Sequence, residues 1–193
     1  MKQSWLWACV AVLSLGLSGC ALSPQQLNPT PKITTQIMPV GNGQPIAVRV
    51  VDGRSSPALG TRGGLYADTS TISVPSNTLQ PKLQAEVEAG VRLLGFTPNV
   101  NAYNAPQMTV TLTRLSYQSP KEGLYVTEAT IGAELRVDVR NGGRSHSSRY
   151  SATLNQGFGM APNEETNTRL VSDVLTDALN RAFSDPAIGQ ILR

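Results

Sequence analysis

Residues 128–143 read EATIGAELRVDVRNGG and contain the clearest structural pattern in the chain. Apolar and polar residues alternate in a pattern that runs from Tyr125 to Val139, which is typical of an antiparallel strand with one buried and one solvated face. One parity holds Ala129, Ile131, Ala133, Leu135, Val137 and Val139, and the other holds Glu128, Thr130, Glu134, Arg136, Asp138 and Arg140. Asn141-Gly142-Gly143 accepts the positive φ of a tight hairpin, so a return strand is predicted over about 144–156.

Shorter strands are predicted before this hairpin. Ile46 to Val51 is a β-branched run, and residues 107–117 form a strand whose alternation slips near Arg114, which indicates a bulge or an edge position. Residues 52–64 are rich in Gly, Ser, Pro and Arg and are predicted as a long loop, while 65–74 have room for one short strand.

Two helices are predicted from apolar residues at helical spacing. The first covers roughly 78–94, with Thr78 as N-cap, Pro81 in its first turn and Gly95 as its stop. The second covers about 164–183 with Asn163 as N-cap, and Asp185-Pro186 begins a last helical turn. The apolar positions are Leu79, Leu83, Val87, Val91 and Leu94 in the first helix, and Leu170, Val171, Val174, Leu175, Ala178, Leu179 and Phe183 in the second.

This order of elements predicts an α+β fold. We expect a two-layer sandwich in which two helices pack on one face of a twisted, mainly antiparallel sheet. Residues 46–193 are expected to form a single domain, since roughly 145 residues are enough for one core.

The N-terminus has the features of a cleaved leader. Lys2 precedes an apolar run from Trp5 to Leu17, and small residues lead to Cys20 in the sequence Leu17-Ser18-Gly19-Cys20. A charged start, an apolar core of about 7–15 residues and a small-residue cleavage site predict a secretory signal, residues 1–19. The leader resembles those of bacterial lipoproteins, which implies S-diacylglycerol and N-acyl groups on Cys20. An aspartate directly after the cysteine would resemble the signal for retention in the inner membrane. Ala21 occupies this position instead, which favours the outer membrane, with the domain facing the periplasm.

Residues 20–45 are expected to form a lipidated, semi-extended tether. They contain five prolines and few large apolar groups, so they are expected to lift the domain tens of ångströms from the membrane. The alternative is that part of this segment, Ile33 to Met38, pairs as an edge strand.

Composition excludes several classes of function. The chain has 16 basic and 13 acidic residues, and loss of Lys2 with the leader leaves a net charge of +2. This mild, scattered charge does not predict nucleic-acid binding. Its two cysteines are Cys9, which leaves with the leader, and Cys20, which takes lipid, so neither a disulfide nor a thiolate site is expected.

No catalytic set emerges from the motifs. His146 is the only histidine, and a histidine beside a hairpin is expected to be solvated. Glu128 and Glu134 share a strand face, but six residues separate their Cα atoms by ~20 Å, which is too far for a glycosidase pair. The chain has no GxSxG, HExxH, phosphate-binding glycine loop or EF-hand pattern. We therefore expect no enzyme, cofactor or metal.

The loop after the first strand of the domain is the one candidate binding segment. It carries Asp52, Arg54 and Arg62, and charged residues in a glycine-rich loop are able to bind a carboxylate or a sugar. The alternative is a polar turn whose aspartate accepts hydrogen bonds from backbone amides.

The mature chain resembles the YajG family of uncharacterised bacterial lipoproteins. The matching features are Leu17 to Cys20, the proline-containing segment, Asp52 and Arg54 with Leu59-Gly60, the helix that ends at Gly95-Phe96, and Val174 to Leu179 with Ile191-Leu192. The resemblance implies an outer-membrane lipoprotein and carries over only Cys20 as a functional residue.

The expected function is a membrane-tethered, non-enzymatic binding or envelope-assembly module. Its polar sheet face or the 52–64 loop is expected to dock an envelope protein or peptidoglycan, while Cys20 holds it in the outer-membrane lipid. The alternatives are a structural lipoprotein that self-associates by pairing an edge strand, and an enzyme with an unfamiliar carboxylate site at Asp52, Arg54 or Glu128.

The anchor is tested by Cys20→Ala or by globomycin treatment of cells. Cys20→Ala should leave an unprocessed precursor without lipid, because cysteine is the residue that supplies the thiol for diacylglyceryl transfer. Globomycin blocks the cleavage that follows this transfer, so it should leave an uncleaved precursor that carries lipid. Metabolic labelling with a palmitate analogue and the gel mobility of the chain measure this. Normal maturation and labelling of the variant would contradict the assignment.

Overall fold

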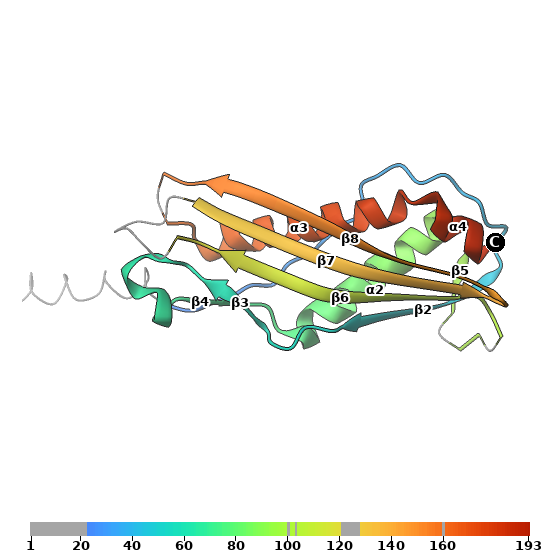
Figure 1. The fold of residues 1–193 in the computed structure, drawn as a ribbon, viewed down its shortest axis with the longest axis horizontal. Coiled ribbons are helices and arrows are strands. Elements are labelled where there is room, and N and C mark those ends of the chain that lie inside the picture. The colour runs from blue at the N-terminus through green and yellow to red at the C-terminus, as the bar shows by residue number, and fades with distance from the viewer. Residues whose placement is uncertain (1–22, 100, 103, 121–127, 160) are drawn as a thin grey trace, which may run out of the picture.

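A long sheet and a layer of helices on one of its faces make up the molecule, seen in Figure 1. This computed structural model describes residues 23–99, 101–102, 104–120, 128–159 and 161–193. The elements are β1 (Gln25–Gln26), β2 (Pro45–Asp52), β3 (Ala58–Thr61), the 3₁₀ helix η1 (Gly64–Thr69), β4 (Thr71–Ser73), α2 (Ser76–Leu93), β5 (Thr97–Pro98), β6 (Gln107–Gln118), β7 (Glu128–Asn141), β8 (Arg144–Gly157), α3 (Glu164–Phe183) and α4 (Pro186–Leu192). The predicted α+β class with a mostly antiparallel sheet is confirmed.

The antiparallel meander β6-β7-β8 contains the longest strands of the sheet and ends in the edge strand β8. A two-residue loop, Gly142-Gly143, joins β7 to β8, and Gly142 has a φ of 58°, as the hairpin prediction requires. The β6–β7 register shifts between Leu112 and Arg114, which confirms the predicted bulge. The first residues of the predicted alternation, 125–127, lie outside the described part of the chain.

Parallel pairings add the remaining strands. The chain between β2 and β6 passes through β3, β4, α2 and β5, and a crossover of this kind lets the two strands pair in parallel. The predicted 52–64 loop is wrong in part because it contains β3, which pairs with β4 and β6. Gly60, which favoured a loop, lies so close to the backbone of Tyr117 that a side chain would not fit there. The strand predicted within 65–74 is confirmed only as the short β4, after η1.

The apolar parity of β7 is fully buried beneath the helices. Its six residues are at most 1% exposed, and α3 contacts both β7 and β8. Burial of these side chains, each worth on the order of 1–3 kcal/mol, stabilises the two-layer arrangement. Among the described residues, no helix has the length and apolar character needed to cross a membrane.

Most of the predicted helix ends are confirmed. Asn163 Oδ1 accepts a hydrogen bond from Thr166 N at 2.8 Å, and Asp185 caps α4 through Ala187 N. Gly95 has a φ of 89° immediately after α2. The N-cap prediction for α2 is wrong, since the helix begins at Ser76 after Pro75, and the Thr78 hydroxyl donates to Pro75 O. Pro81 consequently lies in the second turn.

The proline-containing N-terminal segment is extended, but residues 25–40 do not stand free. Gln25 and Gln26 pair with β4, and Leu27 is 1% exposed. We call residues 27–40 the strap, because they run along α2 and α3 and contact both. The expectation that this stretch lifts the domain from the membrane is therefore not met, and Ile33 to Met38 forms no strand.

Helix side chains satisfy the backbone amides of the strap. On α3, Ser172 and Thr176 accept hydrogen bonds from the amides of residues 30 and 32, each at 3.0 Å. Asn180 Oδ1 accepts from Thr34 N at 2.9 Å and from Thr35 N at 3.0 Å. These three residues are spaced one helical turn apart, so a single polar stripe on α3 holds the strap.

A second set of contacts comes from α2 and from a buried polar chain. Lys82 Nζ lies 2.6 Å from Asn28 Oδ1, and Glu86 accepts a hydrogen bond from Ile33 N. At the start of the segment, the buried Asn167 donates to Gln25 Oε1 at 2.7 Å and accepts from Tyr117 OH at 3.0 Å. These contacts fix the chain from residue 25 onward.

Asn180→Ala should loosen the strap while leaving the sheet intact. The substitution removes the acceptor of two backbone amides, and we expect a loss of about 1–3 kcal/mol in the free energy of unfolding. Tryptic cleavage at Lys32, followed by mass spectrometry, should become several-fold faster. Asn155→Ala, an exposed substitution on β8, is the matched control, and equal cleavage of both variants would contradict this role for Asn180.

Candidate functional site

Asp52 and Arg54 form a buried ion pair. Arg54 donates from Nε to Asp52 Oδ1 at 2.8 Å and from Nη2 to Asp52 Oδ2 at 2.6 Å. Nη2 also donates to Val74 O at 3.0 Å, and the two side chains are 5% and 3% exposed. Burial tends to raise the pKa of Asp52, but the hydrogen bonds and charge of Arg54 outweigh it, so this pKa lies below its usual range. The pair links the end of β2 to the residues that precede α2.

Arg62 does not join this pair. It lies at the opposite end of the β3–β4 pairing, where its backbone amide donates to Ser70 O. Its buried guanidinium donates to Pro162 O at 3.0 Å, just before α3. The three predicted residues are thus divided between two ends of a hairpin, and ligand binding by them stays a prediction.

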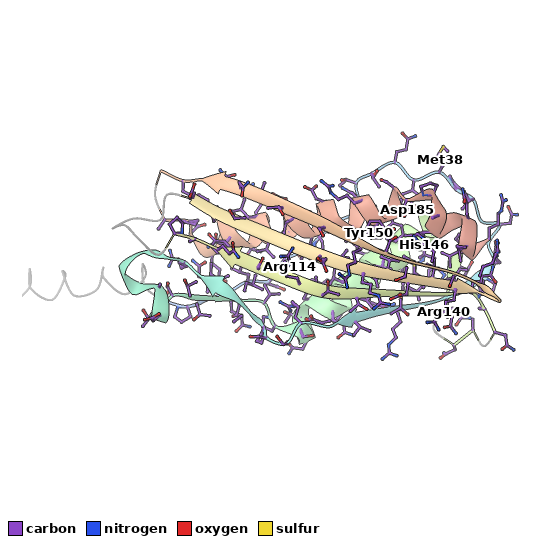
Figure 2. The ribbon with its side chains drawn as sticks, in the orientation of Figure 1. Met38, Arg114, Arg140, His146, Tyr150 and Asp185 are labelled. Carbon is purple, nitrogen blue, oxygen red and sulfur yellow. The ribbon has the colours of Figure 1, made fainter. Side chains whose placement is uncertain are left out.

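A cluster around His146 was not foreseen from the sequence. Figure 2 shows Tyr150 and His146 on β8 beside Asp185, the N-cap of α4. Tyr150 OH donates to Asp185 Oδ2 at 2.6 Å, His146 Nε2 lies 3.4 Å from the same oxygen, and Ser148 Oγ is 3.0 Å from Nε2. The histidine therefore has polar partners on the helix-covered side of β8.

The geometry of this cluster differs from that of a serine–histidine–aspartate relay. In a relay the serine and the carboxylate bind different ring nitrogens, so that a proton crosses the ring. Here Ser148 and Asp185 both approach Nε2. The arrangement instead ties the edge strand β8 to the start of α4.

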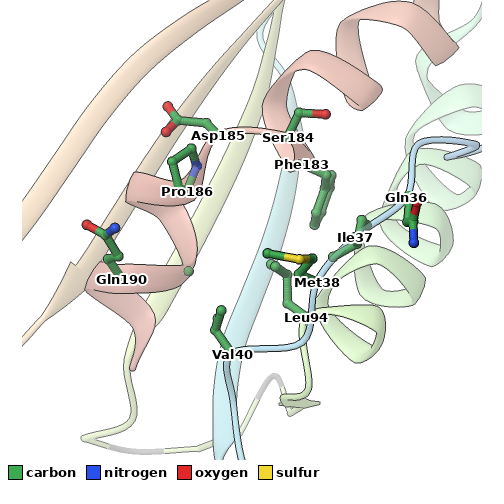
Figure 3. A pocket seen from close by; sticks show the side chains of 11 residues that line it. Gln36, Ile37, Met38, Val40, Leu94, Phe183, Ser184, Asp185, Pro186 and Gln190 are labelled. Carbon is green, nitrogen blue, oxygen red and sulfur yellow. The ribbon is translucent and has the colours of Figure 1, made fainter.

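An apolar cavity lies between the strap, the end of α2 and the α3–α4 junction, as Figure 3 shows. It is lined mainly by Ile37, Met38, Val40, Leu94 and Phe183. Its volume is about 240 Å³, which is below the range of about 300–1,000 Å³ usual for ligand pockets. We assign it to imperfect packing of the strap against the helices.

The uncovered face of the sheet carries a concentration of arginines. We call this surface the arginine face, after its members Arg49, Arg114, Arg136, Arg140 and Arg149, which project from β2, β6, β7 and β8. Arg136 and Arg149 are directly opposite one another on β7 and β8. Like charges in that position destabilise a sheet, and an anionic group bound there would relieve the repulsion.

Few carboxylates balance these charges. Asp138 accepts hydrogen bonds from Arg136, and Glu134 accepts one from Thr113. Burial tends to raise the pKa of Asp138, but hydrogen bonds from Ser147 and Arg136 and the nearby arginine charges lower it below its usual range. In the described part of the chain no hydrogen bond or ion pair holds the side chains of four of the five arginines, namely Arg49, Arg114, Arg140 and Arg149.

The two glutamates that the sequence predicts to be too far apart for a glycosidase pair lie along a single strand. Glu128 and Glu134 lie on the same face of β7, six residues distant along one strand. Within the ranges that the structure describes, no group of three or more histidine, cysteine, aspartate or glutamate residues is placed to hold a metal ion.

A sequence model of the family described as "Uncharacterized lipoprotein" matches residues 31–193. No curated protein matches the chain. Among solved structures, protein XCC0632 from Xanthomonas campestris is 12% identical with a TM-score of 0.48, and the alignment covers 88% of this chain and 94% of that one. Lipoprotein GNA1162 from Neisseria meningitidis is 14% identical with a TM-score of 0.25, covering 69% and 99% of the two chains.

Tyr150→Phe tests the link between β8 and α4. Burial tends to raise the pKa of Asp185, but the hydrogen bond from Tyr150, the Ala187 amide and His146 together hold it below its usual range. Burial, and then the bond to Asp185, raise the pKa of Tyr150. Loss of the hydroxyl should reduce the free energy of unfolding by about 1 kcal/mol near neutral pH.

The pH dependence follows from the directions of the two pKa shifts. The Asp185 contribution is present above the unfolded pKa of about 4 and is lost as pH falls through the lower folded value. The Tyr150 contribution is present below about pH 10 and is lost as pH rises through the higher folded value. Urea unfolding should therefore show the largest difference from the parent between about pH 4 and 10. If the variant and the parent differed in free energy of unfolding by the same amount at every pH, the assigned contributions of Asp185 and Tyr150 would be wrong.

Proposed function

Because this chain belongs to a family of uncharacterized lipoproteins, we propose that it is a membrane-anchored protein whose folded domain binds a partner and catalyses no reaction. Membership of a lipoprotein family implies a lipid anchor. We propose further that Cys20 is acylated and that Ala21 favours sorting to the outer membrane. The domain would then face the periplasm, and the chain would belong to the YajG family. The leader motif and the quoted sequence features support these proposals.

The anchor would hold the domain close to the membrane. Folded structure begins at Gln25, which pairs with β4 and is buried. Five residue steps of at most ~3.6 Å separate Cys20 from Gln25, a reach of about 18 Å. A partner would therefore meet the domain near the bilayer surface.

The arginine face is the observation that carries the binding proposal. It holds five arginines and three carboxylates, Glu128, Glu134 and Asp138, a net charge of +2, which equals the net charge of the whole chain after residue 19. The net positive charge of the protein is thus concentrated on the open face of the sheet. Complementary charge steers association and selects partners. An envelope protein with an acidic surface fits this face better than a neutral glycan does.

The absence of a relay at His146 supports a non-enzymatic role. Asp52 and Arg54 bind one another, which leaves the carboxylate of Asp52 occupied by its own neighbour. The arginines, in contrast, are exposed on the strands of the open face, where Figure 2 labels Arg114 and Arg140. The paired strands fix the spacing of their backbones, and docking of a partner would order the unpaired side chains at a cost in conformational entropy.

Photocrosslinking in intact cells tests the proposal. A photoreactive residue at Ser147, within the arginine face, should capture an envelope protein that the same residue at Asp177, an exposed position on α3, does not. The double variant Arg140→Glu, Arg149→Glu should reduce the adduct at least ~10-fold, because it reverses the charge that attracts an acidic partner.

The control for charge reversal is Arg140→Lys, Arg149→Lys, which keeps the charge and should retain most of the adduct. Equal yields from all these variants would contradict recognition by charge. An adduct that muramidase digests would show that the partner is peptidoglycan, and would overturn the choice of a protein.

A further inference from the structure

β8 is a long strand with one unpaired edge. Its fourteen residues, Arg144–Gly157, pair with β7 on one side and with no described strand on the other (Figure 1). No hydrogen bond within the described part of the chain reaches the outer backbone groups of residues 145–156. The outer N–H and C=O groups of β8 therefore form a row that is ready to pair with another strand.

The usual protections of an edge strand are absent from β8. Natural edges carry prolines, lysines or bulges that prevent pairing with another chain. β8 has no proline, lysine or acidic residue, and Arg149 is its one charge between residues 145 and 156. Its register with β7 is continuous over all fourteen positions, whereas the interior β6–β7 pairing contains a bulge. The unprotected stretch is thus long, regular and almost uncharged.

We propose that β8 pairs antiparallel with β8 of a second copy of this chain, in the register centred on Ala152. Directly opposed residues of antiparallel strands share a face, so a symmetric pair must be centred on a residue. A centre at Ala152 sets Tyr150 against Leu154 of the second copy on the helix-covered side. Both side chains are only partly buried in the single chain, and each would gain an apolar neighbour.

The charge of β8 is compatible with this register and excludes the one centred on Arg149. A centre at Arg149 would oppose two arginines, which is unfavourable. The centre at Ala152 sets Arg149 against Asn155 of the second copy, and Ser151 against Thr153. A strand with complementary acidic residues would relieve Arg149 further but would not reproduce the symmetric Tyr150–Leu154 contact, so a second copy is the better fit.

Attachment to one membrane favours this pairing. Two copies anchored in the same bilayer are confined to a thin layer, which raises their effective concentration for each other. Pairing at β8 would place two arginine faces side by side on one continuous sheet. The pairing does not require the proposed partner of that face, so the two proposals fail independently.

Cysteine crosslinking of the full chain in cells tests the pairing. Two differently tagged copies, one with Ser151→Cys and one with Thr153→Cys, should form a mixed disulfide on mild oxidation, because these positions are directly opposed across the pair. Each copy expressed alone should crosslink at least ~5-fold less. Thr109→Cys, in the middle of the open sheet face, is the matched control and should give no crosslinked dimer.

The mass of the full-length parent chain in detergent gives a second measurement. A dimer together with the mixed disulfide supports the proposal. A monomer alone, a disulfide that is no stronger in the mixed pair, or dimers crosslinked through Thr109→Cys would overturn it. The last result would show instead that two sheet faces meet.

Discussion

Burial of one side of β7 against the helices is the constraint on which the remaining structure depends. A strand alternates its side chains, so once the parity of Ile131 and Leu135 is enclosed, the parity of Arg136 and Asp138 must face solvent. Pairing then transmits this division to β6 and β8, because opposed residues share a face. A shift of one residue would exchange the two sides, which fixes the register of the meander.

The strap follows from the same layering. The helices bury one side against the sheet and leave an outer surface, on which the N-terminal segment lies. An extended chain packed there needs partners for its amides, and Ser172, Thr176 and Asn180 supply them from one stripe of α3. This contact gives a structural role to three polar residues that recur at helical spacing along α3. It also holds the chain against the folded body from Gln25 onward.

The groups that we assign to binding lie on the open face of the sheet and along the edge strand β8. Asp52 and Arg54 bind each other, and the residues around His146 hold β8 to α4. The arginines of the open face, in contrast, are placed by four strands and mostly lack partners. Groups that a fold positions and does not use itself are available to another molecule, which is why we place binding on this face and not in the 52–64 loop.

The α+β class could be predicted from the amino-acid sequence, together with the β7–β8 hairpin, the two long helices with most of their ends, and the leader motif. These features arise from local periodicity and from the conformations that residues such as Gly142 and Asn163 favour. The sequence contained only a weak indication of the strap. Leu27, Ile33 and Ile37 are apolar residues that an extended chain could bury on one side, but the prolines between them are more typical of a free tether. Tertiary structure alone decided the parallel β2–β6 pairing, the meeting of His146 with Asp185, and the gathering of arginines from four strands. Those contacts join residues far apart in the chain, and only the packing of complete elements against one another brings such residues together.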